Sequence, residues 1–172
     1  DDRNDLISTN ALPRNSIITE LNGIGVDLDY YRYHHPCDKP TFLMIGRLFQ
    51  NKGVREFEAA ARMIKQNNPD QEFVLVGSID DNSDSVTRSE LDSWISTGVI
   101  QYLGKLDDVR LAIAQCGVFV LPSYREGLPR TSMEAMAMGR PIITTDVPGC
   151  RETIRLTKKG HIQRLSGASV ME

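Results

Sequence analysis

The sequence predicts an α/β protein in which a parallel β-sheet is flanked by helices. Two observations support this fold class. From Thr41 onward, short apolar runs alternate with segments of helical periodicity, and glycine or proline marks most of the boundaries. Strands separated by helices pair in parallel, because a parallel connection needs about a dozen residues, usually as a helix. With 172 residues, 40% of them hydrophobic, the chain is long enough for one domain with a core.

The lead-in, residues 1–40, is expected to lie outside the core. Residues 17–21 are compatible with one short strand. Asp27 or Asp29 can cap a short helical turn at Tyr30–Tyr33, because a carboxylate accepts the free N–H groups at a helix start. The remainder has the composition of a turn and a linker.

The first predicted strand, Phe42–Ile45, is short and buried, and Gly46–Gly53 is a loop. Val54–Gln66 predicts a helix, because apolar residues recur three and four positions apart. They are Phe57, Ala60, Ala61 and Ile64. Asn67–Asp70 contains a proline and ends this helix. Phe73–Val76 predicts the second strand, which ends at a glycine.

The middle of the chain repeats this pattern. Val86–Thr97 predicts a helix with Leu91 and Trp94 on its apolar face, and Val99–Leu103 predicts a third strand. Asp107–Gln115 predicts the next helix. Its two leading aspartates are placed in the first turn, where negative charge interacts favourably with the helix dipole.

The last predicted elements are a strand at Gly117–Leu121, a helix at Ser132–Met138 that breaks at Gly139, and a strand at Pro141–Thr144. From Arg155 onward the chain is basic and shows no apolar period, so no element is predicted there. Five strands alternating with helices predict a Rossmann-like parallel sheet.

Composition and charge exclude several classes of protein. A net charge of −3 argues against nonspecific nucleic-acid binding. Cys37, Cys116 and Cys150 show no metal or disulfide spacing, which favours a reducing compartment. No apolar run reaches the roughly 18–20 residues of a membrane span. The N-terminus is not a signal peptide and lacks an initiator methionine, so we expect the chain to be a fragment.

A loop at the end of the first strand carries two cations between two glycines. Arg47 and Lys52 lie between Gly46 and Gly53, just before a predicted helix. A diphosphate is bound by this combination of bare backbone, a fork-shaped guanidinium and a compact ammonium. The loop is neither a P-loop nor a G-x-G-x-x-G loop. The alternative is an ordinary solvated loop.

The second candidate is Ser123–Glu134, which follows a buried strand and enters a helix. Glu126 and Glu134 lie eight residues apart, so one falls in the loop and the other inside the helix. They could contact different parts of one long ligand. Gly127–Pro129 offers bare backbone for hydroxyl groups, and the N–H groups of Arg130–Ser132 would face an anion. The alternative is one capping and one surface glutamate.

Other residues with ligand chemistry do not predict a site. Asp80–Asp84 lacks the central glycine and the twelfth-position glutamate of a calcium loop. His34, His35 and Cys37 lack a fourth zinc ligand. Cys150 has no neighbouring base to activate it as a nucleophile. We therefore predict no metal.

Four stretches of the chain, taken in order, resemble the donor-binding domain of the group 1 (GT4) glycosyltransferases. They are Gly46-Arg47 with Lys52-Gly53, Val74–Gly77, Pro122–Pro129, and Ala135–Gly149 with Glu152. Their order and spacing match over about residues 17–154, which makes the resemblance specific. The residues of Tyr124–Arg130 and the helix that contains Trp94 are most similar to those of one branch of the family. That branch builds bacterial capsule, O-antigen and related surface glycans.

The resemblance implies the C-terminal half of a two-domain GT-B fold, which binds a nucleotide-sugar donor. Residues 1–40 then correspond to the end of the acceptor-binding domain and a linker, residues 41–154 form the nucleotide-sugar-binding domain, and residues 155–172 are an atypical basic tail. The family retains anomeric configuration and needs neither metal nor cofactor, because cations and helix N-termini take up the leaving-group charge.

The resemblance also implies roles for single residues. Arg47 and Lys52 would bind the donor diphosphate, and Glu126 would meet the transferred sugar near its reacting face, which makes these three the candidate catalytic residues. The implied donor-binding residues are Gly46, Gly77, Leu103, Gly127, Leu128, Pro129, Arg130, Thr131 and Glu134. Glu134 would hold the ribose hydroxyls, and Gly77 and Leu103 would flank the base, expected to be uridine.

The leading hypothesis is therefore the UDP-sugar-binding part of a retaining glycosyltransferase of bacterial surface polysaccharide synthesis. The alternative is a noncatalytic module that binds nucleotide-sugar or docks a partner; an epimerase or phosphorylase of the same fold is a third. We expect the full-length enzyme to act on a glycan or lipid-linked acceptor through a missing N-terminal domain, and this fragment to be inactive alone. We expect a cytoplasmic protein. The basic tail either contacts the inner membrane, which would make the protein peripheral, or is simply solvated.

Overall fold

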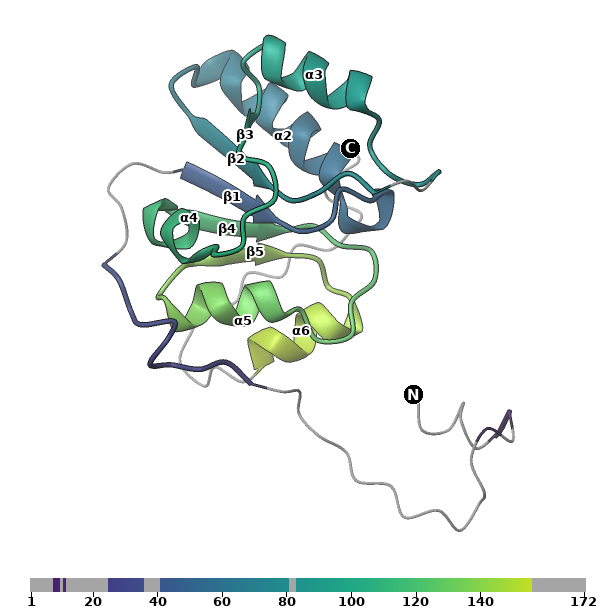
Figure 1. Cartoon of the computed structure of the whole chain (residues 1–172), viewed down its shortest axis with the longest axis vertical. Coiled ribbons are helices and arrows are strands. Elements are labelled where there is room, and N and C mark those ends of the chain that lie inside the picture. The colour runs from purple at the N-terminus through teal and green to yellow at the C-terminus, as the bar shows by residue number, and fades with distance from the viewer. Residues whose placement is uncertain (1–7, 10, 12–24, 36–40, 81–82, 156–172) are drawn as a thin grey trace.

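The computed structural model describes residues 8–9, 11, 25–35, 41–80 and 83–155. Five strands in this part of the chain form one sheet, as shown in Figure 1. They are β1 (Thr41–Ile45), β2 (Glu72–Val76), β3 (Gln101–Tyr102), β4 (Val118–Leu121) and β5 (Ile142–Thr144). The spatial order is β3-β2-β1-β4-β5, and all four neighbouring pairs are parallel. The predicted parallel, Rossmann-like sheet is confirmed.

Helices cover both faces of the sheet. The elements are the 3-10 helix η1 (Gln50–Lys52) and the α-helices α2 (Val54–Asn67), α3 (Arg88–Ser96), α4 (Arg110–Gln115), α5 (Arg130–Ala137) and α6 (Pro148–Arg155). Leu43 and Ile45 of β1 join a core with α4, α5 and α6, whereas Met44 joins a core with α2 and α3. Figure 1 shows these two helical layers above and below the strands. The alternation follows from the two-residue period of a strand.

The order of the strands creates a switch point between β1 and β4. From β1 the chain proceeds through α2 to β2 on one side, and β4 with β5 extends the sheet on the other. Ligands of open α/β sheets bind at the carboxyl ends of the strands at such a point. Here the carboxyl ends of β1 and β4 lead into Gly46–Gly53 and Ser123–Glu134, the two candidate loops.

Two predicted elements of the middle region are shorter than expected. Thr87 caps α3 in a reciprocal capping box with Glu90, so the helix begins at Arg88 instead of Val86. The third strand is confined to Gln101–Tyr102. The reason is that the N–H groups before it donate to the Trp94 carbonyl at the end of α3, which removes them from the sheet.

The predicted position of Asp107 and Asp108 in the first turn of a helix is wrong. The helix α4 begins at Arg110, and Asp108 lies ahead of it. The Asp108 carboxylate accepts the Arg110 backbone N–H at 3.0 Å and also pairs with its guanidinium. These bonds to Arg110 lower the pKa of Asp108 to about 2.

The described part of the lead-in packs against the domain. The predicted cap at Asp27 is present, because its carboxylate accepts the N–H groups of Asp29 and Tyr30. The turn lies at residues 28–30, ahead of the predicted Tyr30–Tyr33, and the Tyr31 N–H closes it by donating to the Asp27 carbonyl at 2.9 Å. Tyr31 is buried and joins the core on the α4–α5 side, although the lead-in was expected to lie outside it. The His34 N–H donates to the Met138 carbonyl at 3.2 Å.

A buried arginine holds the lead-in in place. Arg140 is only 3% exposed, and its guanidinium donates to the carbonyl oxygens of His34, Cys116 and Met138. A planar guanidinium with five N–H groups can serve several acceptors at once. Arg140 thereby connects the lead-in with the ends of α4 and α5.

The helix α6 was not predicted. No element was predicted after Pro141–Thr144, whereas Cys150 lies in the first half of α6 and is fully buried. Proline and glycine at its first two positions resemble a turn in sequence, yet proline is well tolerated at a helix start. Among the residues that the structure describes, no helix has the length and apolar character needed to cross a bilayer.

Candidate functional site: a cavity at the ends of β1 and β4

A cavity of about 220 Å³ lies at the switch point. Its walls come from the end of β1, the loop that contains η1, the end of β4 and the start of α5. The lining residues are Ile45, Gly46, Arg47, Lys52, Leu121, Glu126, Leu128, Pro129, Arg130 and Thr131. Eight of these ten were predicted as site residues, so the fold brings most of the two candidate loops together.

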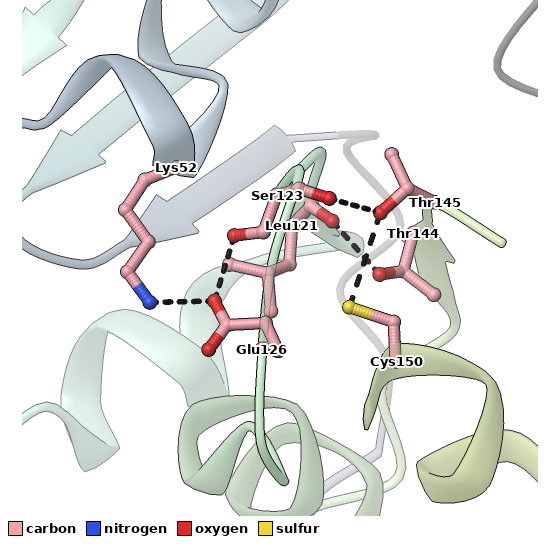
Figure 2. A network of polar contacts seen from close by, with 7 residues as sticks. All are labelled: Lys52, Leu121, Ser123, Glu126, Thr144, Thr145 and Cys150. Atoms are coloured by element: carbon pink, nitrogen blue, oxygen red, sulfur yellow. Dashed lines mark hydrogen bonds and ion pairs between the residues drawn. The ribbon is translucent and has the colours of Figure 1, made fainter. Parts of the chain in front are cut away.

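An ion pair joins the two loops across the cavity. Lys52 Nζ lies 2.6 Å from Glu126 Oε1, and the two side chains are 21% and 11% exposed. Figure 2 shows Lys52 reaching from η1 to the carboxylate on the opposite loop. Because the pair is partly withdrawn from water, its attraction is stronger than that of a surface pair.

A serine supplies a second donor to the same oxygen. Ser123 Oγ donates to Glu126 Oε1 at 2.7 Å, and Ser123 is fully buried. The Thr145 hydroxyl, just beyond β5, donates to the Ser123 carbonyl, and the Thr144 hydroxyl donates to the Leu121 carbonyl at 2.8 Å. These bonds join the ends of β4 and β5, and Figure 2 shows Thr144 and Thr145 beside Leu121 and Ser123.

Arg47 lies at the rim of the cavity. Its side chain is 64% exposed, lies over the Phe49 ring at 4.5 Å, and is 3.7 Å from the Asp80 carboxylate. Such an exposed pair is weak, which leaves the guanidinium free to turn toward an anion. The loop itself is anchored, because Leu48 exchanges backbone hydrogen bonds with Ser78 and Val86.

The start of α5 faces the cavity between the two glutamates. Arg130 and Thr131 line the cavity in the first turn, and no side chain of the described residues caps this end. Uncapped N–H groups and the positive end of the helix dipole attract anions. The cavity therefore combines a helix N-terminus with two cations.

Glu134 lies beneath this helix start. It is 5% exposed, and its Oε1 is 2.9 Å from Arg130 Nε. Burial, a hydrogen bond to Glu134 and the charge of that carboxylate raise the pKa of Tyr31 to about 12. Neither Glu126 nor Glu134 is the capping or surface residue of the alternative interpretation, because both are held by named partners inside the fold.

Four predicted residues lie outside the cavity lining: Gly77, Leu103, Gly127 and Glu134. Gly77 supports the site through close packing, since a Cβ there would lie 1.7 Å from the Gly46 carbonyl oxygen. Its own carbonyl accepts the Tyr102 hydroxyl at 2.7 Å. Leu103 is 40% exposed beyond β3.

The sequence missed three supporting residues: Ser123, Thr145 and Gly149. Gly149 has no side chain where α6 meets the glutamate loop, because a Cβ would lie 2.3 Å from the Glu126 carbonyl oxygen. A small polar residue just after a strand was the available signal for Ser123 and Thr145, but many loops carry one. Cys150 lies 3.9 Å from Thr145 Oγ1, and burial raises the pKa of its thiol, which agrees with its dismissal as a nucleophile.

The chemistry of the cavity suits a ligand that is anionic in one part and hydroxyl-bearing in another. Lys52, Arg47 and the α5 N-terminus attract negative charge, and a carboxylate at Glu126 accepts hydrogen bonds from hydroxyl groups. Together with the switch point, this defines an α/β domain with a cavity of anion-attracting groups at the ends of its parallel strands.

Comparison with known proteins places this domain in a family. Residues 39–166 match the family described as glycosyl transferases, group 1. The chain is 41% identical over 116 residues to N,N'-diacetylbacillosaminyl-diphospho-undecaprenol alpha-1,3-N-acetylgalactosaminyltransferase of Campylobacter jejuni, covering 67% of this chain and 29% of that protein. It is 34% identical over 111 residues to UDP-Gal:alpha-D-GlcNAc-diphosphoundecaprenol alpha-1,3-galactosyltransferase of Escherichia coli, covering 63% and 28%.

Solved structures share the fold. The C-terminal domain of the group 1 glycosyl transferase LpcC from Francisella tularensis matches with a TM-score of 0.60 at 22% identity, covering 70% of both chains. HepE from Anabaena, in complex with UDP-glucose, matches with a TM-score of 0.63 at 22% identity, covering 83% of this chain and 41% of that one.

The chain belongs to the group 1 glycosyltransferases. The predicted family and the predicted C-terminal half of a GT-B fold are both confirmed. The chain spans less than a third of the length of the two curated relatives.

Proposed function

We propose that this chain is the donor-binding part of a retaining glycosyltransferase that uses a UDP-sugar in bacterial surface polysaccharide synthesis. The observation that carries the proposal is the Lys52–Glu126 ion pair beside the α5 N-terminus, inside the switch-point cavity. Support also comes from the relatives, whose names specify transfer of N-acetylgalactosamine or of galactose from UDP-galactose.

The proposed donor lies with its diphosphate between the cations and the helix. Lys52 and Arg47 contact phosphate oxygens from one wall, and the N–H groups of Arg130 and Thr131 contact them from the other. The sugar then lies beside Glu126 and the backbone of Gly127–Pro129. The ribose extends toward Glu134, and the uracil toward Gly77 and Leu103.

This arrangement stabilises the leaving group. Transfer breaks the bond between the anomeric carbon and the β-phosphate oxygen, and negative charge develops on that phosphate. The Lys52 ammonium and the start of α5 already line the cavity where this charge develops, and the exposed Arg47 at its rim turns toward it, so little reorganisation is needed. Loss of either cation is expected to cost about 2–4 kcal/mol of transition-state stabilisation. We propose that these groups suffice without a metal or a cofactor.

The acceptor site is proposed to lie in the remainder of a longer protein. Both curated relatives are named for acceptors linked to undecaprenol diphosphate. A lipid-linked glycan of this class would bring the enzyme to the cytoplasmic face of the inner membrane as a peripheral protein. We expect the chain alone to bind donor without efficient transfer.

Isothermal titration calorimetry on this chain tests the donor site. The ligands are UDP, UDP-galactose and UDP-N-acetylgalactosamine, with and without EDTA. We expect binding that EDTA does not change and that weakens at least tenfold in Lys52→Ala, since a charge-assisted bond to phosphate is lost. Glu134→Ala should weaken the binding of all three ligands, because each contains the ribose that Glu134 is proposed to hold.

Lys65→Ala is the matched control, because Lys65 lies near the end of α2 and its Nζ donates to the Gly98 carbonyl beyond α3, outside the cavity lining. It should leave every affinity unchanged. If none of the three nucleotides binds, the proposed donor site is overturned. Transfer activity of the longer protein then distinguishes an enzyme from a binding module.

A further inference from the structure

The two oxygens of the Glu126 carboxylate have different surroundings. Oε1 accepts hydrogen bonds from Lys52 Nζ at 2.6 Å and from Ser123 Oγ at 2.7 Å. Within the described part of the chain, no donor contacts Oε2. Figure 2 shows Oε2 pointing away from both Lys52 and Ser123. One oxygen is therefore fixed by the protein, and the other remains available as an acceptor.

The two donors on Oε1 differ in rigidity. Lys52 reaches the carboxylate through a flexible four-carbon side chain, and its ammonium can rotate among several acceptors. Ser123 is fully buried, and its short side chain has one rotatable bond to the hydroxyl oxygen. Its position is set by the backbone, and its own carbonyl accepts the Thr145 hydroxyl. The serine is therefore the donor that fixes the orientation of the Glu126 carboxylate.

The difference matters once a diphosphate enters the cavity. The Lys52 ammonium lies in the same lining as the start of α5 and is drawn toward phosphate oxygens. Without a second donor, the Glu126 carboxylate would lose its partner on Oε1 and turn toward solvent, because the phosphates repel it. The Ser123 hydroxyl does not compete for phosphate in this way, because it is buried behind the carboxylate.

We propose that Ser123 is a positioning residue that holds Oε1 of Glu126 so that Oε2 faces the sugar of the bound nucleotide-sugar. Thr145 supports it by fixing the Ser123 backbone from the end of β5. The inference rests on the proposed donor site, and it adds two residues that act through Glu126 without touching the ligand.

The test separates sugar contacts from nucleotide contacts. Titration calorimetry measures the dissociation constants of UDP and UDP-N-acetylgalactosamine for the wild-type chain, Ser123→Ala and Thr145→Val. We expect Ser123→Ala to raise the dissociation constant of UDP-N-acetylgalactosamine about tenfold, which corresponds to the loss of one hydrogen bond to a charged group. The dissociation constant of UDP should change less than twofold. Thr145→Val should act in the same direction with a smaller effect. Ser123→Thr, which keeps the hydroxyl, should recover most of the loss.

A matched control removes another buried hydroxyl. Ser85 is 5% exposed, and its Oγ has no partner among the described residues, so Ser85→Ala should change neither dissociation constant. A double variant shows whether Ser123 acts through Glu126. In Glu126→Ala, which has lost every acceptor of this side chain, adding Ser123→Ala should have no further effect on the UDP-N-acetylgalactosamine affinity.

The outcomes are distinct. Equal weakening of UDP and UDP-N-acetylgalactosamine in Ser123→Ala would assign the serine a structural role and overturn the inference, and so would unchanged affinities. An additive effect of Ser123→Ala in Glu126→Ala would also overturn it. Failure of the wild-type chain to bind UDP would instead overturn the proposed donor site, and the inference with it. Should Ser123→Ala fail to fold by circular dichroism, Thr145→Val carries the same comparison.

Discussion

Gly149 in the first turn of α6 packs against the backbone of Gly127, so closely that a Cβ on Gly149 would lie 2.0 Å from the Gly127 carbonyl oxygen. The α6 helix thus supports the glutamate loop from behind. The contact explains how a helix outside the cavity influences a side chain inside it, because any displacement of this backbone moves Glu126 relative to Lys52.

Gly149→Ala should therefore disturb the glutamate loop. The added methyl group cannot fit without a backbone shift, and overpacking of this kind costs about 1–3 kcal/mol. We expect lower stability in urea and weaker UDP-N-acetylgalactosamine binding by calorimetry. Gly98→Ala is the control: Gly98 has a φ of +69° but no atom near its Cβ position, so the variant should lose stability without losing affinity. An unchanged affinity in Gly149→Ala would contradict the support role of α6.

The Lys52–Glu126 pair should be measurable by a double-mutant cycle. Lys52→Met leaves a largely buried carboxylate without its cation, whereas the double variant with Glu126→Gln removes both charges. We expect Lys52→Met to be the least stable of the three variants and a coupling energy of about 1–3 kcal/mol. Urea unfolding of the four proteins provides the measurement. A coupling energy near zero would show that the pair is not maintained in solution.

Arg140 should control the attachment of the lead-in. Arg140→Met removes hydrogen bonds to the carbonyls of His34, Cys116 and Met138 and leaves these acceptors buried. We expect the free energy of unfolding, measured in urea, to fall by about 3 kcal/mol. Hydrogen bonds to a charged group are individually worth about 1.5–3 kcal/mol and are not additive. Hydrogen exchange at the His34 N–H should accelerate at the same time.

Arg151→Met is the control for this experiment. Arg151 pairs with Asp146, and both side chains are about a third exposed, so its loss should cost less than about 1 kcal/mol. Arg140→Lys should resemble Arg140→Met more than wild type, since an ammonium lacks the planar fork. Slow exchange at His34 in Arg140→Met would refute the anchoring role.

Glu90 should make the stability of the domain depend on acidic pH. Hydrogen bonds from the Arg55 guanidinium and from the Thr87 backbone and hydroxyl lower the pKa of Glu90 to about 2, against an ordinary value of 4.5. A lowered pKa means that the contribution is fully present above pH 4.5 and is lost as the pH falls through about 2. Because this carboxylate is partly exposed, we expect Glu90→Gln to cost only about 1 kcal/mol at pH 7. The difference in melting temperature between wild type and variant should shrink below pH 4.5, and a constant difference would count against the assignment.

The order of strands and helices was predictable because it depends on local pattern. The short buried run predicted at Phe42–Ile45 and the three-and-four spacing predicted in Val54–Gln66 appear as β1 and α2. Boundaries were predicted less well where tertiary hydrogen bonds decide them. The Trp94 carbonyl captures the N–H groups of Val99 and Ile100 and shortens β3, and no sequence period records that bond.

The candidate site divides in the same way. Its cations, its glycines and its two glutamates could be named from the sequence, because the carboxyl ends of parallel strands meet at one edge of a sheet. Their partners could not. Tyr31 belongs to a segment that has no helical or strand period, yet it is buried against the core and hydrogen-bonds Glu134.

By itself, the sequence determined the α/β class, the order of its elements and the residues placed at the strand ends. Only the tertiary structure decided that Lys52 pairs with Glu126, 74 residues away in the chain. It also decided that the Ser123 hydroxyl donates to that carboxylate and that Thr145 bonds the Ser123 carbonyl. The physical reason is that periodicity encodes which face of an element is buried, whereas contacts between loops depend on which strands are neighbours. Here the pairing of β1 with β4, which are not consecutive in the chain, brings the two loops together.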